Sequence, residues 1–197
     1  MRIIQNGQPR EAAGAFANAE ELAVSLVASG DEAPQIVVSM RLDGVGVPGE
    51  RLADLSEISL VGVREVEIAT RPARELALQS LDSAAAYAGE VGKALTETAE
   101  LMRASRPEVA NEQFAEVIDA MSVLFFALDA AARQLGEEAV GIESIGERIQ
   151  PWLDQILEAQ QTQDWIRVAD YLEYEVGPVI DDAPTMIRSV AERCALG

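Results

Sequence analysis

The side chains of this chain that could do chemistry are mostly carboxylates, because Asp and Glu number 34 and histidine is absent. Glu143 with Glu147, and Asp181 with Asp182, are spaced closely enough to share a divalent cation, which prefers oxygen ligands. Helical bundles with di-iron centres use Glu-x-x-His pairs instead. Because these acids lie mostly off the apolar positions, we expect a solvated face and no metal or cofactor. An enzyme with a carboxylate-bound divalent metal is the alternative.

The sequence also lacks the bases that usually activate a catalytic nucleophile. Serine and threonine hydroxyls have no histidine base, and Lys93 is the only lysine. Cys194, the single cysteine, lies on an apolar stripe near the chain end, where packing is the expected role. It cannot form an internal disulfide, which suits a reducing compartment. We therefore assign no catalytic residue, expect no enzyme, and expect a cytoplasmic location.

One motif imitates a nucleotide site. The segment from Gly44 to Gly49 matches G-x-G-x-x-G and follows an expected strand. A dinucleotide site also needs a helix starting at the motif and further βαβ units, and neither is apparent here. Pro48 stiffens the segment, so a hairpin loop is the preferred interpretation.

The charge balance argues against two classes of partner. The formal net charge is -19, and residues 72–197 hold 23 acids against 9 bases. Phosphate backbones and anionic lipids attract clustered Lys and Arg, and no such cluster exists. The longest apolar run, Met121 to Leu128, is far shorter than the roughly 20 residues of a membrane span. We expect neither nucleic-acid nor membrane binding.

The period of the apolar residues changes near Pro72, which predicts two domains, a small mixed module over 1–71 and a helical module over 72–197. The first module begins with a strand from Arg2 to Gln5, an Asn-Gly turn, and an edge strand from Gln8 to Ala13 that contains Pro9. A helix capped by Asn18 follows and closes at Gly30. This order, continued by two strands, resembles a β-grasp (ubiquitin-like) module.

The two later strands show alternating patterns. From Gln35 to Leu42 the pattern places four apolar residues on one face: Ile36, Val38, Met40 and Leu42. From Arg64 to Thr70 it places Val66 and Ile68 inward and the glutamates between them outward.

The second module reads as an antiparallel bundle of about four helices, so the predicted fold class is α+β. The first helix runs from Pro72 to Arg106, and Gly89 and Gly92 would let a neighbour approach closely. Its heptad seam consists of Leu81, Ala84, Ala88, Val91, Leu95, Thr98 and Met102. The second helix starts at Pro107 and carries a similar register, namely Phe114, Val117, Met121, Leu124, Leu128, Ala131 and Leu135.

Prolines fall inside the last two helices. Pro151 should kink or divide the third helix, which carries Ile142, Ile149 and Ile156. The fourth begins after Asp164 and keeps its apolar phase through Gly177-Pro178 to Cys194, which predicts one bent helix rather than two.

The most distinctive segment is acidic and aromatic. Asp164-Trp165 is followed by the run from Asp170 to Glu175, which contains two tyrosines. Aromatic residues on a rigid helix make good interface anchors. The candidate interface residues are Trp165, Tyr171, Tyr174 and Glu175. Ordinary packing is the competing interpretation, since Trp165 is in core phase.

This segment, together with the junction from Val66 to Pro72, resembles passages of small acidic bacterial proteins of unknown function. The resemblance implies no chemistry. With no site for catalysis, the sequence favours a non-catalytic protein-interaction module, an adaptor or chaperone-like binder of protein partners. A structural homo-oligomer, joined by the helical seam between Leu81 and Met102, is the other alternative.

Overall fold

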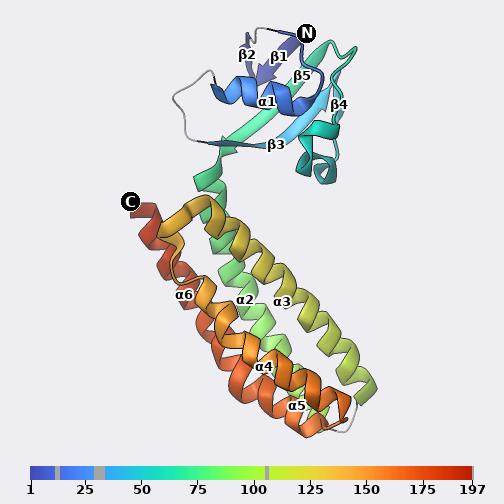
Figure 1. The fold of residues 1–197 in the computed structure, drawn as a ribbon, viewed down its shortest axis with the longest axis vertical. Helices are drawn as coiled ribbons and strands as arrows, with labels where there is room; N and C mark the ends of the chain where they lie inside the picture. Colours follow the sequence, from blue (N-terminus) through green and yellow to red (C-terminus); the bar gives the residue numbers. More distant parts are fainter. Residues whose placement is uncertain (12–13, 29–33, 105–106, 197) are drawn as a thin grey trace. The chain divides into compact units, whose positions relative to one another are not determined.

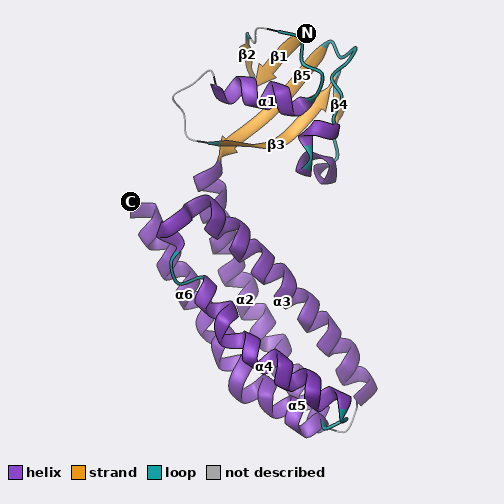
Figure 2. Cartoon of the chain, viewed as in Figure 1, coloured by secondary structure: helices purple, strands orange, loops and turns teal. Residues whose placement is uncertain are grey.

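The computed structural model describes residues 1–11, 14–28, 34–104 and 107–196 (Figure 1). The chain divides into two compact units, Met1–Leu76 and Ala77–Gly197, and each is described by itself. The division falls within the first turn of a helix, whereas the sequence placed it before Pro72. The first unit holds the sheet and the second is helical, so the predicted α+β class is confirmed (Figure 2).

The first unit is a five-stranded mixed sheet in the order β2-β1-β5-β3-β4. The strands are β1 (Arg2–Gln5), β2 (Gln8–Arg10), β3 (Gln35–Leu42), β4 (Val45–Gly46) and β5 (Glu65–Pro72). β1 and β5 run parallel at the centre, and the other neighbours are antiparallel. A mixed sheet of this order carrying one helix is the predicted β-grasp-like arrangement.

The first hairpin follows the predicted turn chemistry. Asn6 and Gly7 both have positive φ, 52° and 76°, as a two-residue type I′ turn requires. The returning strand β2 is shorter than predicted and ends at Arg10. It lies at the edge of the sheet, where Pro9 removes no hydrogen bond from a ladder between strands.

Helix α1 (Ala19–Ala28) begins at a capping box. The Asn18 Oδ1 atom accepts a hydrogen bond from the Glu21 N–H at 3.0 Å, and the Glu21 carboxylate accepts one from the Ala17 N–H at 2.7 Å. Leu22 is fully buried in the core of this unit, together with Val66 and Ile68 of β5. The predicted helix end at Gly30 lies outside the described residues.

The predicted face of β3 is wrong in its first half. Met40 is buried and Leu42 half-buried, but Ile36 and Val38 are 36% and 39% exposed, and Val37 packs against the core instead. The pairing with β5 explains the change, because two steps along β3, from residue 37 to residue 39, match a single step along β5. This β-bulge shifts the alternation by one residue, so the side chains before it exchange faces.

The glycine-rich motif forms the β3–β4 hairpin and its exit. Gly44 has φ +83° in the turn, Val45–Gly46 is β4, and Pro48 precedes a 3₁₀ turn at Gly49–Ala53. Pro72 ends β5 rather than starting the next helix, because β5 still pairs with β3 there.

The second unit is built from helices that lie side by side (Figure 1). The first three are α2 (Ala73–Arg103), α3 (Pro107–Leu135) and α4 (Glu143–Gln161), and the first turn of α2 belongs to the first unit. The last, which we call the final rod, consists of α5 (Trp165–Tyr171), a π-helical turn (Leu172–Val176) and α6 (Gly177–Leu196). Short connections join them, including a 3₁₀ turn at Gly136–Ala139. The predicted helical bundle is thus confirmed.

The predicted seams form the core of the bundle. All seven seam residues of α2 and all seven register residues of α3 are buried. Thr98 is completely buried, and its hydroxyl donates a hydrogen bond to the Ala94 carbonyl at 2.7 Å, so this hydroxyl is paired within the core. A Cβ added at Gly92 would lie 2.7 Å from the Asp181 Oδ1 atom of α6, which shows the predicted close approach. Gly89 faces open space instead.

The final rod is helical without interruption from Trp165 to Leu196. The single helix predicted through Gly177-Pro178 is present, and it contains the π-helical turn just before them, in which the Gly177 N–H donates to the Leu172 carbonyl. Pro178 has no N–H to give and its ring crowds the carbonyl four residues earlier, so the turn before it widens. A Cβ at Gly177 would lie 2.9 Å from the Leu172 carbonyl oxygen. Pro151 and Pro184 lie inside continuous α-helix.

Candidate functional site

The acidic-aromatic segment forms α5 and the π-helical turn, and two of its four candidate residues are partly packed. Trp165 and Tyr171 lie half-buried against the bundle core. The Tyr171 ring contacts Trp152 of α4, with ring centroids 5.8 Å apart. Its hydroxyl oxygen accepts a hydrogen bond from the Arg167 Nε atom at 3.1 Å. The ring contact holds α5 against α4, whereas the hydrogen bond lies within α5.

The other two candidate residues lie on the π-helical turn. Tyr174 is 62% exposed and Glu175 is half-buried. The Arg103 guanidinium, at the end of α2, lies 5.6 Å from the centre of the Tyr174 ring. Of the predicted interface residues, Tyr174 is therefore the one that offers most of its surface to solvent.

Arg103 also joins α2 to the final rod by two ion pairs. It contacts Asp170 at 2.8 Å and Glu173, while its side chain is only 31% exposed. The hydrogen bond to Asp170, followed by the one to Glu173, raises the pKa of Arg103 above its ordinary value. This arrangement is structural, because both carboxylates are already paired with a permanent cation.

A groove with a volume of about 580 Å³ lies between α3 and α4. Apolar side chains from both helices line it, namely Phe114, Ala115, Ile118, Leu153, Ile156 and Leu157. Leu157 is 54% exposed, and the exposure of its apolar surface to water is unfavourable in free energy. We call this hollow the α3–α4 groove.

The polar residues of the α3–α4 groove are Asn111, Asp119 and Gln160. Residues 107–125 and 150–161, which build this half of the two helices, contain six acids and no lysine or arginine. Among the side chains that the structure describes, no hydrogen bond or ion pair crosses from α3 to α4. Among the described residues, the groove thus has an apolar floor, one acid in its lining, Asp119, and no hydrogen bond or ion pair across it.

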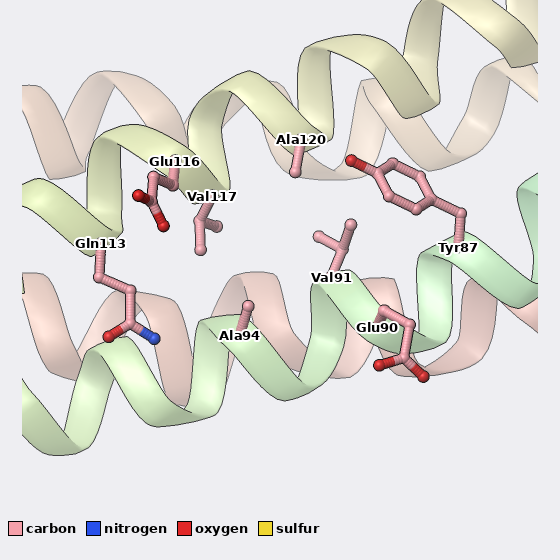
Figure 3. Close-up of a pocket in the computed structure, with 8 residues that line it drawn as sticks. All are labelled: Tyr87, Glu90, Val91, Ala94, Gln113, Glu116, Val117 and Ala120. Atoms are coloured by element: carbon pink, nitrogen blue, oxygen red, sulfur yellow. The ribbon is translucent and has the colours of Figure 1, made fainter.

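A second, smaller hollow of about 260 Å³ lies between α2 and α3 (Figure 3). Its apolar floor includes Val91 and Val117, while the Tyr87 ring reaches from α2 toward α3 (Figure 3). Two of the polar groups around it already have partners. The Gln113 amide donates to Glu97 at 3.4 Å, and Glu90 pairs with Lys93 at 2.7 Å.

The carboxylates considered for metal binding are all exposed on the bundle, namely Glu143, Glu147, Asp181 and Asp182. Asp182 lies 3.7 Å from the Arg148 guanidinium. In the described ranges, no three acidic, cysteine or histidine side chains gather as a metal site. Cys194 is completely buried, and its thiol donates to the Glu138 carbonyl at 3.3 Å. No helix in the described parts of the chain is long and apolar enough to cross a bilayer.

Sequence reasoning missed the α3–α4 groove, although a signal was present. Ile118 follows Val117 of the α3 register, and Leu157 follows Ile156 of the α4 stripe. Each helix therefore carries an apolar residue beside the stripe that is buried in the core of the bundle. Two such widened stripes on helices consecutive in the chain indicate a shared apolar surface.

A family model described as a domain of unknown function (DUF8042) matches residues 79–184, more than half of the chain. The chain belongs to this family. The DUF8042 match starts in α2 and ends in α6, so it includes the α3–α4 groove, Arg103 and the π-helical turn. The sheet of the first unit lies outside it. No curated protein and no solved structure is significantly similar to the chain.

Proposed function

We propose that this protein is a non-catalytic protein-binding module, an adaptor or a chaperone-like binder of protein partners. The α3–α4 groove carries the proposal, because its floor is apolar, it is open to solvent, and no hydrogen bond or ion pair joins its walls among the described residues. Burial of apolar surface is the main driving force of protein association, at about 25 cal/mol per Å². A partner side chain that fills the groove would also cover Leu157 and Ile118.

The side chains available for chemistry support a binding role rather than catalysis. The chain has no histidine, the single lysine pairs with Glu90, and the cysteine is buried. None of these groups is placed as an activated nucleophile or a general base. Because a lone buried thiol suits a reducing compartment, the proposal places the protein in the cytoplasm.

Self-association remains compatible with this proposal, but through a surface other than the α2 seam that the sequence suggested. The heptad seam of α2 is buried within the chain's own bundle, and Leu81 and Leu95 are at most 1% exposed. A homo-oligomer would therefore have to use another surface. Tyr174 marks a second candidate contact, because it is exposed on the final rod.

Site-specific photo-crosslinking in the native host tests the proposal. A benzophenone amino acid replaces Leu157 in one variant, Ile166 in a second and Tyr174 in a third. Ile166 is a matched control, since it is 55% exposed on α5 and lies outside the groove lining. We expect a discrete crosslinked protein from position 157 and none from position 166. The absence of any crosslinked protein from positions 157 and 174 would refute a binding role.

A further inference from the structure

The shape of the α3–α4 groove limits what can bind in it. Its α3 wall runs from Asn111 to Asp119, which spans about 12 Å at 1.5 Å per residue, or roughly two helical turns. Both walls are helices, whose backbone groups are bonded internally and offer no strand edge. An extended peptide would leave its own backbone unpaired against these apolar walls. A helix satisfies its backbone internally, and its side-chain ridges fit between those of two others.

The charge of the groove limits the partner further. Asp119 lies in the groove lining, which the structure describes without any lysine or arginine, and the stretches of α3 and α4 that build the groove are acidic in sequence. Of these acids, Glu116 lines the α2–α3 hollow and Glu158 interacts with Arg167 of α5, so Asp119 carries the argument. The two arginines of these helices lie elsewhere, with Arg133 paired to Asp129 at 2.6 Å and Arg148 near Asp182. Acidic partners would be repelled, whereas lysine and arginine beside an apolar stripe would be attracted.

We propose that the α3–α4 groove binds a basic amphipathic helix of a partner protein, with apolar anchors at positions i, i+3 or i+4, and i+7. This inference rests on the proposed binding function and adds the chemical class of the partner. The anchors insert between Ile118 and Leu157, and the flanking basic residues face Asp119 and the neighbouring acids. Two helical turns of contact give a small interface, so the charges contribute mainly to selectivity and to the rate of association.

Three fluorescent peptides of about 18 residues test the proposal by anisotropy with the full-length chain. The first has leucine at the anchor positions and lysine elsewhere, the second has glutamate in place of lysine, and the third is a scrambled form of the first. We expect the first to bind at least about tenfold more tightly than the other two, since both the stripe and the charge are required.

Two pairs of variants place the binding on the groove. Leu157→Gln should raise the Kd of the basic peptide about tenfold, whereas Ile166→Gln, equally exposed and outside the groove, should change it less than about twofold. Asp119→Asn should weaken binding more than Asp82→Asn, which removes an exposed charge of α2 outside the groove. Unchanged tryptophan fluorescence shows that each variant keeps the fold.

Several results would overturn the inference. Equal affinity for the basic and the scrambled peptide, or equal losses in Leu157→Gln and Ile166→Gln, would show general charge attraction. Equal affinity for the acidic peptide would exclude a basic partner. A change in molar mass by light scattering for Leu157→Gln alone would assign the groove to a second copy. If a discrete protein still crosslinks at position 157, failure of the peptides refutes the partner class and leaves the binding function standing.

Discussion

The two flanks of the helical bundle differ in how their helices are joined. On the closed flank, where α2 meets the final rod, Gly92 lets Asp181 and Ile180 approach, and Arg103 pairs with Asp170 and Glu173. On the open flank, where α3 meets α4, a groove of about 580 Å³ separates apolar walls without a described polar bridge. The closed flank is joined by close packing and ion pairs, and the open flank leaves apolar surface exposed.

This difference does not arise from the heptad registers, which are similar in α2 and α3. It arises from the residues beside them. Glycine and ion pairs flank the register on the closed side, whereas medium-sized apolar residues such as Ile118 and Leu157 flank it on the open side. The open apolar surface of this bundle is thus encoded next to the core positions rather than in them.

The largest expected difference between the flanks is in the response to truncation. Ile180→Ala on the closed flank should lower the free energy of unfolding by about 2–5 kcal/mol, because Ile180 is completely buried. Leu157→Ala on the open flank should cost less than about 1 kcal/mol. Urea unfolding followed by tryptophan fluorescence measures both, since the two tryptophans lie in α4 and α5. Equal costs would abolish the distinction between the flanks.

The π-helical turn provides the next effect. Gly177→Ala should destabilise the bundle by about 1–3 kcal/mol, because the added Cβ would press on the Leu172 carbonyl. The matched control is Gly146→Ala in α4, where a Cβ meets nothing within 4 Å. That change should stabilise by about 0.5–1 kcal/mol through helix propensity. If Gly177→Ala proves as stable as its control, the close contact does not constrain the turn.

Removal of the Arg103 ion pairs should have a smaller effect. Arg103→Met keeps the side-chain stem and should cost about 1 kcal/mol, since the pairs are only partly buried. The pKa of Arg103 is raised in the folded state, so its contribution is fully present below the unfolded-state pKa and is lost only as pH rises through the folded-state value. The measured cost should therefore be the same at pH 7 and pH 9. A marked decrease at pH 9 would contradict this assignment.

The smallest expected effect concerns Tyr174. Its ring is largely exposed and meets Arg103 over one face, so Tyr174→Ala should change the free energy of unfolding by about 0.5 kcal/mol or less. The affinity of the basic peptide should not change. A loss of binding with unchanged stability would move the interface from the open flank to the acidic-aromatic segment.

Much of the fold could be predicted because its signals are local and periodic. The Asn6-Gly7 turn, the Asn18 cap and the α2 seam each follow from a few neighbouring residues. The bulge at Val38 could not be predicted, because it is defined by pairing with β5, some thirty residues away in the chain. Burial of Val37 in place of Val38 is visible only once that partner is placed.

The candidate site was harder to predict than the fold, because its residues gain meaning only in pairs. Trp165 and Tyr171 are conspicuous in the sequence, yet α4 and the core partly cover them. Leu157 and Ile118 are inconspicuous, yet they face one groove from two helices. Residue type marks anchors, but only the packing of neighbouring helices decides which of them remain open.

The thiol of Cys194 can report how often the C-terminal end of the bundle opens. It is buried in the last turns of α6 and donates a hydrogen bond to the Glu138 carbonyl. Because the sequence contains no other cysteine, any reaction with a thiol reagent reports on this residue alone. A disulfide reagent can reach the sulfur only when the last turns of α6 move away from the rest of the bundle. Its rate of reaction in native buffer therefore measures how often this local opening occurs in the unmodified protein.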